Sequence, residues 1–318
     1  MKLGILGTGK IVQEFLPEFV KLKIEIAAIL GMLRSKERVE NLAAQYNIKK
    51  IYFDYDEILA DENFDTVYIA LPNNLHYLHA KKALLAGKNV IVEKPAVTTA
   101  EELADLKKIS TENKKILLEA MTIHYLPAYL NIRADLEKLG NIKIVSLNYS
   151  QYSSRYDAFK RGEILPAFDA KKAGGALMDL NVYNLQFVIG LFGKPENFTY
   201  TANIERGIDT SGVLVLDYGK FKAVCIGAKD CQAPTVSTIQ GDGGNIFTEI
   251  PVNRIDAYTL NGELKNFAEN KSRMTYEFEN FVEIIDGKNF ERAEKMLSIC
   301  EISTKILQDA RAQVGIKI

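Results

Sequence analysis

The chain has 318 residues, which is enough for about two domains of ordinary size. Apolar residues make up 47% and charged residues 25%, as is typical of a globular protein, and this excludes a collagen-like repeat, a long disordered chain and a disulfide-stapled miniprotein. The 40 basic and 41 acidic residues give a formal net charge of -1, so the basic excess typical of nucleic-acid binders is missing.

The cysteines and the apolar stretches indicate a cellular location. The 3 cysteines are widely spaced and do not form the pattern of a disulfide framework, which favours thiols in a reducing compartment. The longest uncharged stretch near the middle, residues 180–193, is shorter than the roughly 20 residues that a membrane span needs. The first residues lack the apolar core of a secretory signal. We therefore expect a cytoplasmic protein with neither a membrane partner nor a nucleic-acid partner.

Short apolar runs alternate with helical patterns over the first 120 residues. The expected strands cover residues 2–6, 24–30, 51–53, 67–71, 89–92 and 115–118. The first expected helix carries Ile11, Phe15 and Phe19 at helical spacing, and the later ones cover residues 35–46, 74–86 and 98–112. The last of these opens with the spacing of a capping box, Thr98 to Glu101. Strands that alternate with helices predict right-handed crossovers and a parallel sheet.

The pattern changes after about residue 121. Helices are expected at 126–139 and 176–192, with a long partly alternating run at 142–151. Further strand-like runs follow at 198–206, 213–218, 221–227, 235–240 and 246–250. Consecutive strands with no helix between them predict an antiparallel sheet. Helical patterns at 278–285 and 291–310 end the chain. The expected fold is an α/β domain at 1–120 followed by an α+β domain at 121–318.

A glycine-rich turn joins the first strand to the first helix. Its residues are Gly7, Thr8 and Gly9, followed by Lys10 and Ile11. Glycines let a backbone turn tightly and approach a pyrophosphate, and the helix start offers free N–H groups and a positive dipole end. Val12 stands where the usual pattern has a third glycine. The alternative is a plain turn between a strand and a helix.

The end of the second strand bears on the choice of nucleotide. An NAD site usually has an acidic residue there, which accepts hydrogen bonds from the ribose hydroxyls. This sequence has Arg34 and Ser35 instead, and a guanidinium pairs well with the oxygens of a 2′-phosphate. We therefore expect NADP, with NAD as a possible cofactor. A solvated arginine at a helix start is the alternative.

The tripeptide Glu93-Lys94-Pro95 follows a central strand, at the sheet edge where ligands of open α/β sheets bind. A lysine at this edge can act as an acid or base, and nearby positive charge makes it easier to deprotonate. Pro95 fixes the turn and can take a cis peptide bond. By spacing alone, an exposed loop lysine is the simpler interpretation.

Several motifs in order resemble one family over nearly the whole chain, the glucose–fructose oxidoreductase, inositol dehydrogenase and MocA group. They are Gly7 to Ile11, Arg34 and Ser35 with Glu37-Arg38 and Leu42-Ala43, Leu71-Pro72-Asn73-Asn74-Leu75-His76, Glu93-Lys94-Pro95, and Gly174-Gly175-Ala176-Leu177-Met178-Asp179-Leu180-Asn181-Val182-Tyr183. The resemblance implies an N-terminal Rossmann domain and a C-terminal substrate-binding and oligomerisation domain with an open, mostly antiparallel sheet. It implies an NAD(P)-dependent dehydrogenase or reductase of a sugar, polyol or cyclic diol, assembled as a homodimer or homotetramer.

The resemblance also implies roles for single residues. Lys94 assists proton transfer, and Asp179 and Tyr183 complete the catalytic set. Tyr183 replaces the family's histidine, as in the dihydrodiol dehydrogenase branch; a phenol is a poor base near neutral pH but a good proton donor. The implied cofactor contacts are Gly7, Thr8, Gly9, Lys10, Ile11, Arg34, Ser35, Leu71, Pro72, Asn73, His76, Glu93 and Lys94. The implied substrate contacts are Lys94, His124, Asp179 and Tyr183.

Asp179 and Tyr183 are four residues apart in an expected helix, so they share one face of it. We expect that face to meet Lys94 and the nicotinamide. The alternatives are a surface or cap carboxylate for Asp179, a core aromatic for Tyr183, and a structural role for His124.

No metal site is expected. His76 and His79 are three residues apart, but no acidic ligand is placed beside them by spacing. The alternative function is a non-catalytic NAD(P)-binding sensor or regulator, because a fold does not fix a function. The presence of Lys94 favours the enzyme.

Overall fold

The computed structural model describes residues 1–317, so the expected end of the second domain at residue 318 lies outside the described residues. The chain forms two compact units. The first comprises Met1–Ala120 and Ser272–Ser298, and the second comprises Met121–Lys271 and the residues from Ile299 onward. The sequence pattern changes where the first unit's main segment ends. Residues 272–298, which the sequence analysis placed with the second domain, pack with the first unit.

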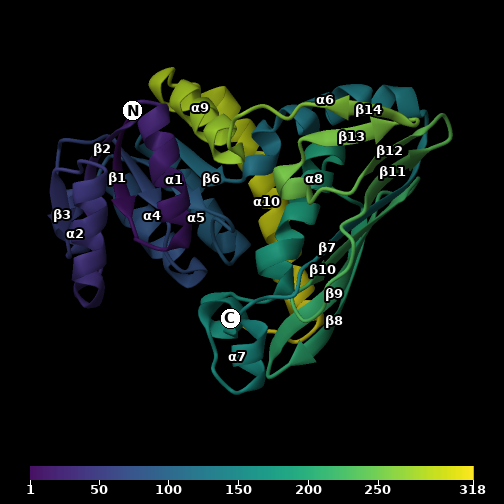
Figure 1. Ribbon diagram of the computed structural model, residues 1–318, viewed down its shortest axis with the longest axis horizontal. Coiled ribbons are helices and arrows are strands. Elements are labelled where there is room, and N and C mark those ends of the chain that lie inside the picture. The colour runs from purple at the N-terminus through teal and green to yellow at the C-terminus, as the bar shows by residue number, and fades with distance from the viewer. Residues whose placement is uncertain (318) are drawn as a thin grey trace. The chain divides into compact units, whose positions relative to one another are not determined.

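The first unit contains a six-stranded parallel sheet in the order β3-β2-β1-β4-β5-β6 (Figure 1). Its strands are β1 (Lys2–Leu6), β2 (Glu25–Leu30), β3 (Lys50–Tyr52), β4 (Thr66–Ile69), β5 (Asn89–Glu93) and β6 (Leu117–Ala120). The strand order reverses between β1 and β4, which bond to each other in parallel. In such sheets ligands bind at the carboxyl ends of the strands where the order reverses. The predicted Rossmann domain is confirmed.

The helices of the first unit are α1 (Lys10–Lys21), α2 (Lys36–Gln45), α3 (Tyr55–Leu59), α4 (His76–Leu85), α5 (Ala100–Glu112) and α9 (Arg273–Asp286). The short helix α3 was not predicted; the side chain of Asp54 caps it by accepting from the N–H groups of Asp56 and Glu57. The capping box before α5 lies one residue later than predicted, because Thr99 and Glu102 form it.

Aromatic packing explains why α9 belongs to the first unit. The ring centroid of Phe278 on α9 lies 4.8 Å from that of Phe15 and 4.6 Å from that of Phe19, both on α1. Its centroid also lies 5.5 Å from that of Tyr68 on β4. All four rings are buried. The amphipathic pattern at 278–285 predicts a helix correctly, but only these contacts show which sheet that helix covers.

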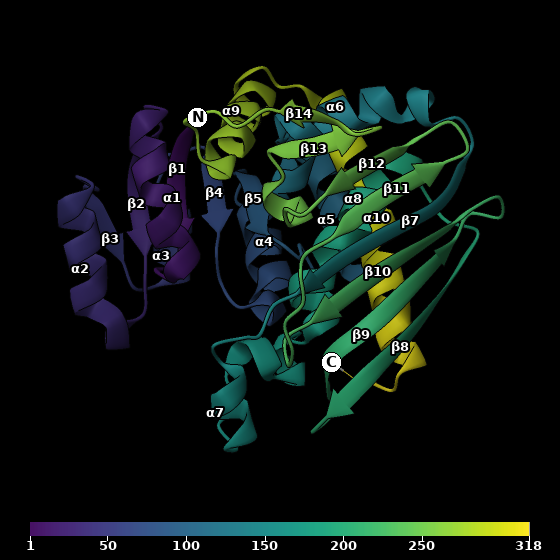
Figure 2. The same cartoon turned by 45° about the vertical axis from the view of Figure 1, so that its right-hand side comes forward.

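The second unit contains an eight-stranded sheet in the order β14-β13-β12-β11-β7-β10-β9-β8 (Figure 2). Its strands are β7 (Ile142–Ser150), β8 (Asn197–Glu205), β9 (Ile208–Asp217), β10 (Lys222–Ala228), β11 (Ser237–Gly241), β12 (Asn245–Thr248), β13 (Ala257–Leu260) and β14 (Glu263–Asn266). Strands β7 and β10 run parallel, whereas the other neighbours run antiparallel. The predicted, mostly antiparallel sheet is confirmed; the sequence analysis missed β13 and β14.

The helices of the second unit are α6 (Pro127–Asp135), α7 (Tyr156–Lys160), α8 (Val182–Phe192) and most of α10 (Phe290–Gln313). The helix expected at 126–139 ends as α6 at Asp135 and continues as a tighter turn to Leu139. Helix α8 contacts β7 and β10, and both views show it on one face of the sheet (Figures 1 and 2). None of the helices described is long and apolar enough to cross a bilayer.

Candidate active site

The glycine turn at the carboxyl end of β1 has the backbone that a phosphate loop requires. Gly7 has φ +111°, and a Cβ there would lie 2.4 Å from the carbonyl oxygen of Ala70. Only glycine fits this position without strain. Gly9 caps α1 in an extended conformation, and a Cβ there would meet nothing within 4 Å. A side chain at Gly9 would therefore project into open space beside the helix start.

The start of α1 is electrostatically suited to an anion. Its first turn contains no acidic residue. The side chain of Gln13 donates to the carbonyl oxygen of Thr8 at 3.0 Å, which ties the turn to the helix. Lys10 is exposed, and its ammonium lies 3.7 Å from Glu14. Free N–H groups and the positive end of the helix dipole give this helix start the chemistry that suits a phosphate.

A pocket of about 560 Å³ opens at this turn. Every residue that lines it belongs to the first unit. Its lining is Gly7, Thr8, Gly9, Leu30, Gly31, Met32, Leu33, Arg34, Ser35, Arg38, Phe53, Tyr55, Ala70, Leu71, Pro72, Leu75 and His79. Of the expected cofactor contacts, the glycine turn, Arg34, Ser35, Leu71 and Pro72 therefore line one pocket.

The lining of this pocket is basic. Arg34, Ser35 and Arg38 line it, and no acidic residue is among its lining residues. Arg34 and Arg38 are exposed. Sequence reasoning missed Arg38 as a contact, since it lies within α2 and looks like an ordinary solvated residue. Two guanidinium groups fit a 2′-phosphate better than they fit bare ribose hydroxyls. The hydroxyl of Ser35, which lines the same pocket, donates to the carbonyl oxygen of Met32 at 3.0 Å.

His76 connects two loops instead of lining the pocket. Its side chain is fully buried, and its Nδ1 and Nε2 atoms lie 2.9 Å and 2.8 Å from the carbonyl oxygens of Pro95 and Leu71. Burial lowers the pKa of His76, and it outweighs the two carbonyl groups that favour protonation. His76 thereby fixes the Leu71 loop against the Lys94–Pro95 loop. Both loops end neighbouring strands of the sheet.

The Glu93-Lys94-Pro95 tripeptide begins at the carboxyl end of β5. The hydroxyl of Tyr68 donates to Glu93 at 2.6 Å, and burial raises the pKa of Glu93 against the opposing effects of Tyr68 and Lys94. Lys94 is half-buried. The Lys94–Pro95 peptide bond is cis, as the sequence analysis allowed. The N–H of Ala96 donates to Glu119 on β6 at 2.9 Å.

Sequence reasoning missed Glu277, a buried acid on α9. Its side chain is 0% exposed, and neither carboxyl oxygen has a hydrogen-bond partner among the described residues. Burial raises its pKa well above the usual range, and the neighbouring charges of Glu93 and Glu119 add to this effect. A third carboxyl group therefore lies near those of Glu93 and Glu119, and its burial favours the protonated form.

The second-unit motif lies on a helical turn that begins with two glycines. Gly175 has φ +105°, and a Cβ there would lie 2.0 Å from Oδ1 of Asp209. The other carboxyl oxygen of Asp209 accepts from the N–H of Leu177 at 2.6 Å. Asp179 lies within a π-helical turn, Leu177–Asn181, that continues directly into α8. Turns of this kind occur frequently at functional sites.

The structure places the remaining candidates as follows. The side chain of Asp179 is 37% exposed and bonds to Lys229. Tyr183 is 9% exposed, and its ring centroid lies 6.2 Å from that of Tyr149. His124 is buried, with Nε2 3.0 Å from Gln186. This burial favours the structural alternative for His124. Lys94 belongs to the first unit, and Asp179 and Tyr183 belong to the second.

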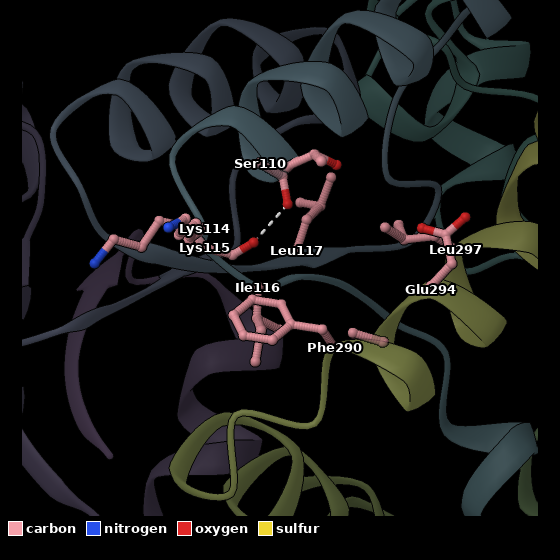
Figure 3. Close-up of a pocket in the computed structure, with 10 residues that line it drawn as sticks. Ser110, Lys114, Lys115, Ile116, Leu117, Phe290, Glu294 and Leu297 are labelled. Carbon is pink, nitrogen blue, oxygen red and sulfur yellow. Dashed lines mark hydrogen bonds between the residues drawn. The ribbon is translucent and has the colours of Figure 1, made fainter.

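A second pocket, of about 440 Å³, lies at the amino end of β6 (Figure 3). The ring of Phe290 and the side chain of Ile116 line it, and Ser110 donates to the carbonyl oxygen of Lys115 at 2.6 Å. It lies at the end of the sheet opposite to the glycine turn. Ligands of open α/β sheets bind at the carboxyl ends of the strands, so the first pocket is the candidate ligand site. The described residues contain no cluster of metal-ligating side chains.

Comparison with known proteins identifies a matching family model and similar enzymes. A model described as "Oxidoreductase family, NAD-binding Rossmann fold" matches residues 1–121. The scyllo-inositol 2-dehydrogenase (NADP(+)) IolU of Bacillus subtilis is 33% identical over 322 residues, which cover 99% of this chain and 98% of that protein. The trans-1,2-dihydrobenzene-1,2-diol dehydrogenase of Mus musculus is 27% identical, covering 99% of this chain and 97% of that protein.

Solved structures share the fold. KijD10, a 3-ketoreductase from Actinomadura kijaniata crystallised with NADP and TDP-benzene, has a TM-score of 0.84 at 19% identity and covers 98% of this chain and 97% of its own. The oxidoreductase TM0312 from Thermotoga maritima has a TM-score of 0.85 at 20% identity and covers 100% of this chain and 98% of its own.

Proposed function

We propose, from the premise that this chain belongs to the oxidoreductase family with an NAD-binding Rossmann fold, that it uses NADP to oxidise or reduce a sugar, polyol or cyclic diol. It is an NAD(P)-dependent oxidoreductase that acts on CH–OH groups. The observation that carries the cofactor proposal is that one pocket is lined both by the glycine turn and by Arg34, Ser35 and Arg38.

In this proposal the residues of the first unit hold NADP. The N–H groups at the start of α1 bind the pyrophosphate, and Arg34, Arg38 and Ser35 bind the 2′-phosphate. The Leu71–Asn73 loop and Glu93 shape the nicotinamide end. When bound, the nicotinamide accepts or supplies the hydride.

The chain's own groups move the proton. During oxidation the proton of the substrate hydroxyl passes to Lys94, directly or through the phenol of Tyr183. During reduction Tyr183 gives its phenol proton to the substrate oxygen and Lys94 returns one proton to Tyr183. Asp179 accepts a hydrogen bond from a substrate hydroxyl and thereby orients it. That Lys94, Asp179 and Tyr183 act in one site is part of the proposal.

A substrate screen tests this function. The absorbance of the reduced nicotinamide is followed with inositols, aldoses, other polyols and cyclic diols, with NAD and NADP in parallel. We expect turnover with at least one inositol or diol and a higher kcat/KM with NADP. The Lys94→Ala variant is the control, and it should bind NADP without turnover. Tight nucleotide binding with no turnover by the wild type on any compound would favour the alternative, a non-catalytic sensor or regulator.

We also propose that the chain forms a homodimer or homotetramer through the eight-stranded sheet. Leu214 and Leu216 on β9 are fully buried, whereas their neighbours Val213 and Val215 are half-buried and point to the opposite face. Val215 pairs with Val224 across the β9–β10 ladder. These valines form an apolar patch on the face opposite to α8, where a second copy can cover it.

Sedimentation analysis of Val215→Lys tests the assembly. The lysine should shift the protein to the monomer, because it places a charge in the apolar patch. Leu264→Lys on β14 is the matched control, since Leu264 is 67% exposed, and it should leave the assembly unchanged. An unaltered assembly in Val215→Lys would contradict this interface.

A cytoplasmic location completes the proposal. It is supported by the three cysteines, which carry thiols and not disulfides among the described residues. Cell fractionation with an antibody to the native chain tests it, and recovery from the membrane or secreted fraction would contradict it.

A further inference from the structure

Lys229 is a lysine buried within the second unit. It follows β10, and its backbone N–H donates to the carbonyl oxygen of Thr210 at 2.8 Å. Its side chain is 2% exposed. Lysine is almost never fully buried unless its charge is paired, because desolvating an ammonium is costly. The buried charge of Lys229 therefore requires a specific partner.

Three groups surround the ammonium of Lys229. It donates to Oδ2 of Asp179 at 2.8 Å and to the carbonyl oxygen of Ala167 at 2.7 Å. It also lies 4.5 Å from the centre of the Phe168 ring. An ion pair, a carbonyl acceptor and an aromatic face together fix its position, so the ammonium has little freedom to follow a moving carboxylate.

Of the Lys229–Asp179 ion pair, only the Asp179 side chain reaches the surface of the second unit. The side chain of Asp179 is 37% exposed, whereas that of Lys229 is 2% exposed. The carboxylate is thus held from the interior while part of it faces outward. The backbone beneath it is fixed as well, because Asp209 accepts from the N–H of Leu177 at the start of the same turn.

We propose that Lys229 is a positioning residue, which holds Asp179 ionised and in one orientation so that its exposed side accepts a hydrogen bond from a substrate hydroxyl. This inference rests on the proposed function. An ionised carboxylate only accepts hydrogen bonds, whereas a protonated one also donates. Without the ammonium of Lys229, Asp179 would lose the 2.8 Å ion pair that holds its carboxylate in this orientation.

A double-mutant cycle on activity tests whether Lys229 acts through Asp179. The variants are Lys229→Met, which keeps the side-chain length, Asp179→Asn, and the two combined. Lys229→Met should lower kcat/KM for the substrate about tenfold or more and leave KM for NADP unchanged. In the Asp179→Asn background the same change should alter kcat/KM less than about twofold. Equal losses in both backgrounds would overturn the inference.

Lys160→Met is the matched control. Lys160 also pairs with a carboxylate, Asp157, at 2.7 Å and lies 5.3 Å from the centre of an aromatic ring, that of Tyr156. However, the side chains of Lys160 and Asp157 are 50% and 54% exposed. Exposed pairs contribute little, so this variant should retain wild-type kcat/KM and stability.

Stability gives a readout that needs no substrate. Asp179→Asn leaves the ammonium of Lys229 buried without its anion and should lower the melting temperature, and adding Lys229→Met should restore most of the loss without restoring turnover. Rescue of folding by the double variant supports the pair even if Asp179→Asn alone does not fold. Absence of rescue would overturn the inference. Inactivity of the wild type on every compound would instead contradict the proposed function. The melting temperatures of the variants would still show whether Lys229 and Asp179 are energetically coupled.

Discussion

Replacing His124 by glutamine should change how the stability of the protein depends on pH. Burial lowers the pKa of His124 from 6.5 to about 4. Gln186 donates from Nε2 to Ser303 at 3.0 Å, so its Oε1 faces His124 and accepts from Nε2–H of the neutral ring. The Nδ1 atom has no partner among the described residues, so a proton there would be buried and unpaired.

The magnitude follows from the two pKa values. Below pH 6.5 the unfolded chain binds a proton at this histidine, while the folded chain stays neutral down to about pH 4. The contribution of neutral His124 to stability is therefore full above pH 6.5, the pKa in the unfolded chain, and is lost as the pH falls from there to about 4. At about 1.4 kcal/mol per pH unit, this one group removes about 3 kcal/mol across that window.

The assay is urea unfolding followed by circular dichroism, for wild type and His124→Gln, between about pH 7.5 and about pH 4. The glutamine retains a donor toward Gln186 but does not titrate. His76 and His79 are present in both proteins, so their contributions cancel in the difference. Wild type should lose about 3 kcal/mol more than the variant on acidification. Parallel curves for the two proteins would refute the reasoning.

Three further predictions concern the cofactor, the chemistry and the motif helix. Arg34→Ala or Arg38→Ala should raise KM for NADP about 10- to 150-fold and leave KM for NAD unchanged, since each change removes a charged hydrogen bond worth about 1.5–3 kcal/mol; equal effects on both cofactors would place the 2′-phosphate elsewhere. Lys94→Ala should lower kcat about 10²- to 10⁴-fold with the dissociation constant for NADP unchanged in a fluorescence titration, and near-normal turnover would exclude Lys94 from proton transfer. Burial raises the pKa of Asp209 to about 6, so the folded chain holds a proton that the unfolded chain has released, and stability falls as the pH rises through about 6. Asp209→Asn should remove this fall, measured as the melting temperature at about pH 5 and about pH 8, and a fall that persists would contradict the assignment.

The parts of the site that depend on neighbours in sequence were predictable. The glycine turn lies between a strand and a helix, so its position and tight backbone can be predicted from a few consecutive residues. Arg34 lies in the short turn after the second strand, and the neighbouring first strand brings the glycine turn into the same pocket. Arg38 was missed because nothing local separates an arginine that lines a pocket from one that faces solvent.

The individual helices, strands and turns follow from local patterns: short apolar runs become strands, spaced apolar residues become helices, and glycines become turns, because these depend on interactions within a few residues. Which elements share a core depends on packing between distant segments. The amphipathic pattern around Phe278 is compatible with either unit, and its packing on Phe15 and Tyr68 assigns it to the first. Lys229 likewise has no signal of its own, because its partner Asp179 is distant in the chain and only the folding of β10 against the motif helix gives its buried charge a partner.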